Sequence, residues 1–391
     1  MQPQNLPLLV VGASVRAAAQ SALRAGFTPL CADSFADSDL RSSAQVLSVE
    51  HFPEGLPAAL RQVPKMPWIY TGGLENRPKL LARLALDRPL LGNGAAAVRQ
   101  VRNPRRIEQA LRAADLPALA VRSAREPPPA DGNWMLKPRR GSAGRGIALW
   151  NELARHHPTL KEQHYFQQRV DGDEYSALFL ADPSGVILTG ISRQLIGLPW
   201  GNTPFAWCGN IAPVQVSSAV EQRIRSIGSA LGGAFALRGL FGCDFLLADD
   251  IPWITELNPR YTGSVELFEL QHRRPWLAEH VRACLAETDS PNSPRGDPVS
   301  SPPESSASRA PGVVGKLVVY STRDAVFHRD FPGDRNGDLW TIPQFADIPP
   351  VGQPIPAGTP ICTVFSAADD EVSCQNGLRS RAAEVDAWLL R

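Results

Sequence analysis

A lysine followed by a glycine-rich loop is the strongest chemical signal in the sequence. Lys137 ends a short apolar segment, and Gly141, Gly144 and Gly146 follow shortly after it. Glycines let a backbone turn sharply and bring its N–H groups against phosphate oxygens, where a Cβ atom would interfere. In a Walker A motif the lysine follows the glycines instead. The pattern therefore indicates a different phosphate-binding loop, with a flexible, solvated basic hairpin as the alternative.

A second group of residues, later in the chain, could hold a metal ion. Asp244 lies in one alternating apolar segment, and Glu256 and Asn258 lie in the next, with Asp249-Asp250 between the two. An antiparallel hairpin centred near residue 250 would place Asp244 opposite Glu256. Glu256 and Asn258 would then project from one face, roughly 6–7 Å apart. Such oxygen donors suit Mg²⁺, although polar residues on a half-exposed hairpin would alternate in the same way.

The elements before these motifs are typical of a parallel α/β sheet. Strand and helix signals alternate from the start, over Leu8–Val11, Ser14–Ala25, Phe27–Cys31 and Trp68–Tyr70. Ligand loops in such a sheet lie at the carboxyl ends of the strands. A dinucleotide fingerprint is absent, because Ser14 and Ala17 occupy positions where G-x-G-x-x-G needs glycine. We expect this region to contribute one wall of an active site, with Tyr70 to Asn76 as a substrate loop or an ordinary turn.

The rest of the sequence predicts a mixed α+β region, then a linker and a small carboxyl-terminal module. Helical patterns cover Arg106–Asp115 and Ser217–Leu237, and strand patterns cover Trp134–Lys137, Tyr165–Val170, Tyr175–Leu180, Val186–Gly190, Leu240–Leu247 and Trp253–Leu257. Residues 289–311 are rich in proline, serine and charge, which predicts a disordered linker. Beyond it, Val313–Tyr320 predicts a strand and Ala382–Leu390 a helix, within a small β-rich module.

The overall composition limits the classes of partner and compartment. The net charge is +1 and hydrophobic residues make up 43% of the chain, so nothing in the whole-chain charge favours nucleic acid or an anionic membrane. No apolar run approaches the roughly 20 residues of a membrane helix. The start has no basic segment typical of a signal peptide. The six cysteines form no C-x-x-C pair, which favours reduced thiols in a cytoplasmic protein.

Taken in order, these motifs resemble those of the ATP-grasp superfamily. The Lys–Pro pair with its glycine loop, a later acidic strand and Glu-x-Asn-Pro-Arg occur here in the family's order and approximate spacing. The resemblance implies three parts: a Rossmann-like pre-ATP-grasp domain at residues 1–94, a two-lobed ATP-grasp domain at 95–288 with its nucleotide lobe near 120–180, and a small biotin-carboxylase-like module at 312–391. The implied cofactors are ATP and Mg²⁺ or Mn²⁺.

The resemblance also implies a role for each matching residue. Lys137 would bind phosphate, and the loop from Gly141 through Ser142 and Gly144 to Gly146 would close over it. Gln168 and Val170 would meet adenine, and Glu174 would hold the ribose hydroxyls. Asp244, Glu256 and Asn258 would bind magnesium, while Arg260 would stabilise charge during phosphoryl transfer.

Two positions depart from the family pattern. An Asp–Lys pair is common before the loop, but this chain has Asn103-Pro104-Arg105-Arg106, so Arg105 is the candidate for the missing lysine. The acid that is common in the adenine hinge is Gln167 here. Base recognition would then depend more on backbone and amide groups.

The implied activity is ATP-dependent ligation. A small-molecule carboxylate would be activated as an acyl phosphate and attacked by an amine, with a role in coenzyme assembly suggested. Alternatives are a bicarbonate-activating carboxylase and a non-catalytic nucleotide-binding regulator. A carboxylase would need a separate biotin carrier, because the methionines are only Met1, Met66 and Met135 and no A-M-K-M sequence occurs. The implied partners are small molecules, with a homodimer as an option.

Overall fold

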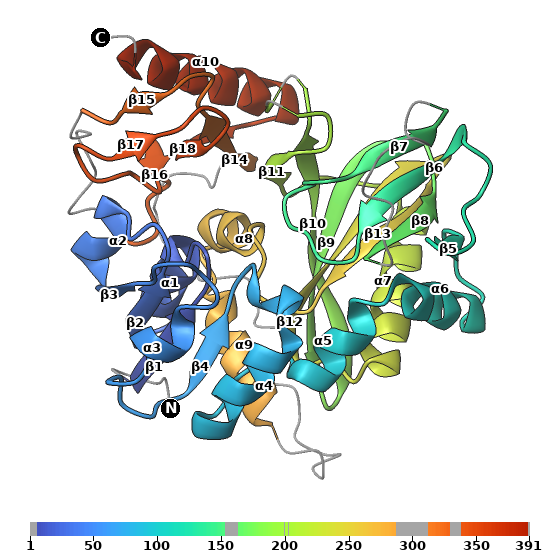
Figure 1. Cartoon of the computed structure of the whole chain (residues 1–391), viewed down its shortest axis with the longest axis horizontal. Coiled ribbons are helices and arrows are strands. Elements are labelled where there is room, and N and C mark those ends of the chain that lie inside the picture. Colours follow the sequence, from blue (N-terminus) through green and yellow to red (C-terminus); the bar gives the residue numbers. More distant parts are fainter. Residues whose placement is uncertain are drawn as a thin grey trace.

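The structure, a computed structural model, describes residues 6–152, 163–198, 200–201, 203–286, 312–328 and 338–389. The expected linker at 289–311 lies outside these ranges. The described residues form three larger sheets and one two-stranded pair, with the amino-terminal sheet at lower left in Figure 1 and the two larger antiparallel sheets above and to its right. Within the described ranges no helix has the length and apolarity needed to cross a membrane. All six cysteines are free.

The amino-terminal region is the parallel α/β sheet that the alternating pattern predicts. Its strands run in the order β3-β2-β1-β4, and every pairing is parallel. The strands are β1 (Leu6–Val11), β2 (Phe27–Asp33), β3 (Gln45–Ser48) and β4 (Trp68–Tyr70). The helices are α1 (Arg16–Arg24), α2 (Ser38–Ser43), α3 (Leu56–Ala59), the 3₁₀ turn η1 (Leu74–Asn76) and α4 (Pro78–Asp87). The carboxyl ends of β1 and β4 therefore lie side by side, as expected for a ligand-facing edge.

A small antiparallel sheet carries the lysine and its loop. Its order is β5-β8-β6-β7, built from β5 (Val121–Ser123), β6 (Asp131–Pro138), β7 (Ala148–Asn151) and β8 (His164–Gln168). Helices α5 (Ala95–Val101) and α6 (Pro104–Ala113) precede it. Leu136, Trp150 and Phe166 form its core. Because Leu136 points into this core, the alternation of β6 turns Lys137 to the opposite face.

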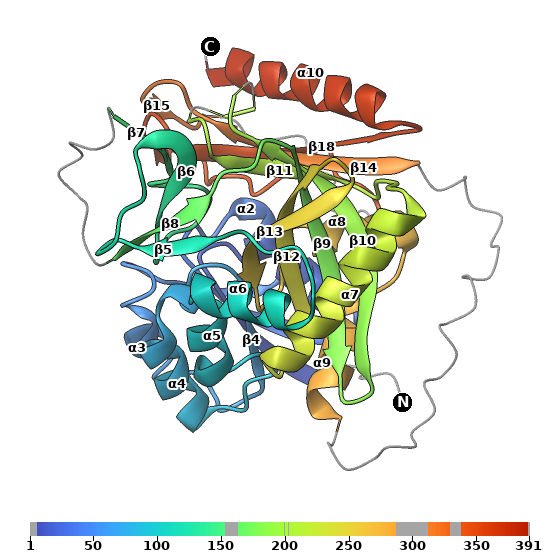
Figure 2. The ribbon, with the colours of Figure 1, turned by 90° about the vertical axis from the view of Figure 1, so that its right-hand side faces the viewer.

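The third sheet is large and joins the middle of the chain to its end. Its order is β13-β12-β9-β10-β11-β14-β18-β16. The strands are β9 (Asp173–Asp182), β10 (Gly185–Ile196), β11 (Trp207–Ala212), β12 (Gly239–Ala248), β13 (Ile251–Asn258), β14 (Val313–Tyr320), β16 (Phe345–Ala346) and β18 (Pro360–Ala368). β14 pairs with β11, so the expected carboxyl-terminal module continues this sheet instead of forming one of its own. The strands β15 (Ala325–Val326) and β17 (Pro354–Ile355) form a small separate pair, which lies with the long helix α10 (Glu371–Leu389) at the top of Figure 1; α10 is also at the top of Figure 2.

Helices cover both faces of the large sheet where β9 and β12 run. Phe179 of β9 faces the core that contains α7 (Ser218–Ala234), and it stacks on Phe241 of β12 at 5.0 Å between ring centroids. The neighbouring Leu178 and Leu180 face the opposite core, with α8 (Val265–His272) and α9 (Trp276–Leu285). The central strands are therefore rigidly sandwiched, and the side chains they present at one end are fixed in position.

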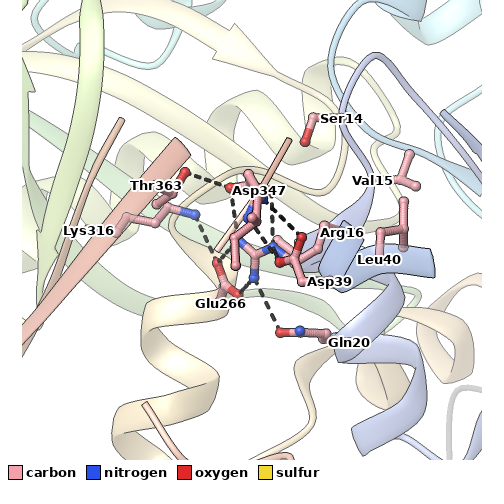
Figure 3. Close-up of polar contacts among 12 residues, drawn as sticks. Ser14, Val15, Arg16, Gln20, Asp39, Leu40, Glu266, Lys316, Asp347 and Thr363 are labelled. Atoms are coloured by element: carbon pink, nitrogen blue, oxygen red, sulfur yellow. Dashed lines mark hydrogen bonds and ion pairs between the residues drawn. The ribbon is translucent and has the colours of Figure 1, made fainter. Parts of the chain in front are cut away.

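A buried ion cluster ties the amino-terminal, middle and carboxyl-terminal regions together (Figure 3). Arg16 of α1 donates to both carboxylate oxygens of Asp347, at 3.0 and 3.1 Å, and pairs with Glu266 of α8. Lys316 of β14 shares Glu266 at 3.2 Å, and Thr363 of β18 donates to Asp347. Removing one member of such a cluster would leave a buried charge unpaired, at a cost of about 3–5 kcal/mol. The cluster therefore fixes the amino-terminal wall against the large sheet.

Candidate active site

The glycine loop and the acidic hairpin lie across a single pocket. Its lining includes Lys137, the loop residues 138–139, 141–145 and 147, and residues 254–257 of β13. Arg102, Ile107 and Leu111 line the wall contributed by α6 and the end of α5, and Tyr165 and Gln167 come from β8. The structure thus brings together the two segments to which the sequence assigns phosphate binding and metal binding.

Lys137 places its ammonium group inside this pocket. Its Nζ donates to Oε1 of Gln167 at 2.9 Å and to the carbonyl of Thr255 at 3.4 Å. Burial lowers the pKa of Lys137, although the carboxylates of Glu256 and Asp244 oppose that shift. A cation held by neutral acceptors in a buried pocket is poorly compensated, so an anion that enters would gain a strong interaction with it.

Glycine is required in the loop both by the turn and by a close approach to the backbone of residue 205. Gly144 has a φ of 76°, and a Cβ atom there would lie 1.6 Å from the carbonyl oxygen of Phe205. Gly146 also has a positive φ, of 78°, but it does not line the pocket. Gly141 and Ser142 do line it. The loop therefore lies against Phe205, just before β11, and its residues 141–145 line the pocket.

The hairpin of β12 and β13 has the register that the sequence predicts. Asp244 pairs with Glu256, and the turn residues Asp249 and Asp250 both have positive φ. Asn258 donates from Nδ2 to Asp244 Oδ2 at 3.0 Å. The carboxylates of Asp244 and Glu256 and the amide of Asn258 therefore lie at one end of the hairpin.

The charges at this end of the hairpin fit a divalent cation. Burial, together with repulsion by the nearby Glu256 carboxylate, raises the pKa of Asp244 to about 6. Among the described residues no group of three or more His, Cys, Asp or Glu side chains is arranged to hold a metal, so the set here is two carboxylates and one amide. Hard oxygen donors with two adjacent negative charges match the preference of Mg²⁺, which keeps places for water and phosphate.

Arg260 is held next to the hairpin by a residue of the amino-terminal region. Its Nε donates to Glu75 Oε1 at 2.8 Å, and its guanidinium also donates to Asn258 Oδ1 at 3.2 Å. Glu75 is only 2% exposed and lies in η1, directly after β4. Glu75 therefore fixes the direction of the Arg260 guanidinium, and a substrate loop at residues 70–76 stays a prediction.

The residues expected to meet the base and ribose lie outside this pocket's lining. Gln168 donates its N–H to the carbonyl of Ala120 at 2.8 Å and accepts the N–H of Ala120 on its side chain at 3.2 Å. Val170 is half-buried, and burial raises the pKa of the half-buried Glu174. Gln167, one residue earlier, does line the pocket. The roles of Gln168, Val170 and Glu174 stay predictions.

Sequence reasoning missed Arg102, which reaches the hairpin from the end of α5. Its Nη1 pairs with Glu256 Oε1 at 2.5 Å, and its Nη2 donates to Asn76 Oδ1 at 2.9 Å. Arg105, the expected substitute for the family lysine, is exposed and does not line the pocket. No pattern in the sequence marks Arg102, because its position depends on where α5 stops and how it packs.

Known proteins share both the motif region and the fold. A family model described as an ATP-grasp domain matches residues 101–264. The carbamoyl phosphate synthase large chain of Pseudarthrobacter chlorophenolicus is 29% identical over 123 residues, which are 31% of this chain and 10% of that protein. The chain thus matches only about a tenth of the length of this curated relative.

Two solved structures are similar over most of their length. The biotin carboxylase domain of Hydrogenobacter thermophilus 2-oxoglutarate carboxylase, in complex with MgADP, ADP and bicarbonate, has a TM-score of 0.70 at 13% identity, covering 95% of this chain and 89% of that one. The L-amino acid ligase of Bacillus licheniformis has a TM-score of 0.68 at 13% identity, covering 97% and 98%. Identities this low show a shared fold alone. The family match and the shared fold thus agree that residues 101–264 of this chain resemble an ATP-grasp domain.

Proposed function

We propose that this protein is an ADP-forming ligase, dependent on ATP and Mg²⁺, that joins a small-molecule carboxylate to an amine through an acyl phosphate. The observation that supports this most strongly is that Lys137, the glycine loop and Glu256 line one pocket, with Asp244 paired to Glu256 across the hairpin. Each of the three alone has a structural explanation. Their meeting in one place does not, because burying charged groups costs desolvation free energy. Such clusters of charged residues are typical of ligand sites.

Asp244, Glu256 and Asn258 would hold the metal ion. When bound, Mg²⁺ or Mn²⁺ would neutralise phosphate charge and relieve the repulsion between the two carboxylates. The raised pKa of Asp244, caused by burial and by Glu256, supports this assignment, since it marks a place where positive charge is lacking. Gln194 donates to Asp244 Oδ1 at 3.1 Å and would keep that carboxylate oriented.

Lys137 and Arg260 would act on the transferring phosphoryl group. The Lys137 ammonium would bind phosphate oxygens from within the pocket, and backbone N–H groups of residues 141–146 would bind them from the loop. Arg260, fixed by Glu75, would hold the negative charge that develops on the acyl phosphate. Gln168, Val170 and Glu174 are proposed to hold the adenosine part.

The reaction proposed for this site has two steps. A carboxylate oxygen of the acid attacks the γ-phosphorus of ATP, the bond from that phosphorus to the β–γ bridging oxygen breaks, and ADP leaves. The nitrogen lone pair of the amine then attacks the acyl carbon, the carbon–oxygen bond to phosphate breaks, and the nitrogen loses a proton. A closed loop over residues 141–146 would exclude water from the acyl phosphate between the two steps.

ADP release in the presence of acid and amine panels tests the proposal. Acids and amines that occur as coenzyme precursors form one arm, and bicarbonate without an amine forms another. We expect release that needs both an acid and an amine, that Glu256→Gln reduces at least about a hundredfold, and that Glu221→Gln on the exposed face of α7 leaves unchanged. Release stimulated by bicarbonate alone would favour the carboxylase, and no stimulation in any arm would favour the non-catalytic nucleotide binder.

A further inference from the structure

Arg102 lies where a phosphate-binding cation is missing from the sequence pattern. It follows α5 directly and lines the same pocket as Lys137. Its side chain is 16% exposed, and its guanidinium reaches three parts of the site: Glu256 of β13, Asn76 of η1 and the carbonyl of Arg139 in the loop, the last at 3.1 Å. An arginine this enclosed, with its plane fixed by acceptors on separate elements, is pre-organised.

The arginine that the sequence suggested cannot take this place. Asn103 caps α6, its side chain accepting the N–H of Arg105 at 3.2 Å, and Pro104 occupies the first turn. This cap fixes the start of the helix so that Arg105 and Arg106 are exposed. Arg102, just before the cap, turns inward instead.

The charges around Arg102 indicate what its guanidinium does in the two states of the site. Without nucleotide, the Glu256 carboxylate pairs with Arg102, and the carboxylates of Glu256 and Asp244 also attract the Lys137 ammonium. Glu256 would lose its pairing with Arg102 Nη1 if it held a metal ion instead. The freed N–H groups would then lie next to the phosphates, which arginine binds in a bidentate manner.

We infer that Arg102 is the second phosphate-binding cation of this pocket, after Lys137. In the free protein Arg102 pairs with Glu256; with ligands bound, Glu256 would hold the metal ion and Arg102 would bind the phosphates. This inference rests on the proposed function in one respect, that the pocket binds a nucleotide; it does not depend on the ligase reaction. Arg102 therefore has two opposite effects: it attracts the phosphates of ATP and competes with the metal ion for Glu256. A residue that merely held the fold together would support both ligands alike.

Binding of each ligand by itself tests the inference. The variants are Arg102→Gln, Arg102→Lys and, as matched control, Arg105→Gln; calorimetry gives the Kd of ATP and of adenosine without metal, and water-proton relaxation gives the Kd of Mn²⁺ without nucleotide. Loss of a charge-assisted contact predicts that Arg102→Gln weakens ATP binding about tenfold to a hundredfold. Adenosine binding should not change, and Mn²⁺ binding should become tighter. Arg102→Lys should recover part of the ATP affinity, and Arg105→Gln should match the wild type.

Each contrary outcome has a distinct meaning. Equal ATP affinity in Arg102→Gln and Arg105→Gln, or weaker binding of Mn²⁺ and adenosine along with ATP, overturns the inference in favour of a structural role. A wild-type protein that binds no ATP overturns both this inference and the proposed function. A wild type that binds ATP and Mn²⁺ but never turns over an acid with an amine overturns only the ligase proposal, and the comparison of variants still decides the role of Arg102.

Discussion

Replacing Glu75 by glutamine tests how the amino-terminal region positions the site. Both Glu75 oxygens are in use: Oε1 accepts from Arg260 at 2.8 Å and Oε2 accepts the N–H of Gly73 at 2.7 Å. A glutamine has one acceptor and one donor in the same places, so one of those N–H groups must face an amide NH₂. Burial makes this conflict unavoidable, because Glu75 is 2% exposed.

The expected loss follows from the bonds involved. Hydrogen bonds to charged groups contribute about 1.5–3 kcal/mol each, and breaking a buried pair costs about 3–5 kcal/mol. We therefore expect Glu75→Gln to lower the free energy of unfolding by about 3 kcal/mol. In the double variant with Arg260→Gln, two neutral amides can pair, so the losses should fall short of additivity by about 2 kcal/mol.

Urea denaturation followed by the fluorescence of the nine tryptophans measures this cycle. The same four proteins should be compared in ADP release, where either single change should reduce turnover because Arg260 loses its direction or its charge. Unfolding energies that add within about 0.5 kcal/mol would show that Glu75 and Arg260 do not interact energetically, and would refute this account of the amino-terminal wall.

Two further predictions concern pH and the loop. Burial lowers the pKa of His280 to about 4, and its Nδ1 accepts the N–H of Leu240 at 2.8 Å, so the folded protein keeps this imidazole neutral. The unfolded chain takes up the proton near its ordinary pKa of about 6.5, so stability should fall as pH drops from about 6.5 to 4, by up to about 3 kcal/mol. NMR titration, with His280→Gln to assign the signal, checks this, and a midpoint near 6.5 would contradict it. Gly144→Ala should displace the loop from Phe205 and weaken ATP binding at least about tenfold, as measured by calorimetry; an unchanged affinity would show that this contact does not shape the pocket.

The hairpin was predictable because local rules fix it. Alternation in β12 and β13 sets which residues share a face, and Asp249 and Asp250 tolerate the positive φ of a tight turn. The pairing of Asp244 with Glu256, expected from a hairpin centred near residue 250, also depends on a register shift between Asp244 and Phe245, which neither the alternation nor the turn residues predict. The parallel α/β arrangement of β1, β2 and β4 was predictable because each strand and helix has its own periodic pattern, whereas β3 at the edge was not foreseen.

The long-range partners were not predictable, because they depend on packing between distant segments. Glu75 meets Arg260 only after the amino-terminal sheet docks through the Arg16 cluster, and Arg102 enters the pocket only because α5 stops where it does. The break before Val313 suggested a separate module, yet β14 continues the large sheet. Composition identifies a linker, but it does not indicate which strand the segment after the linker will pair with.

A crystal structure of the protein with Mg²⁺ and a non-hydrolysable ATP analogue tests the central claim most directly. The account predicts the triphosphate between the loop at residues 141–146 and β13, with metal on Asp244 and Glu256 and Lys137 on a phosphate oxygen. A nucleotide bound elsewhere, with Lys137 still on Gln167 and Arg102 still on Glu256, would contradict it.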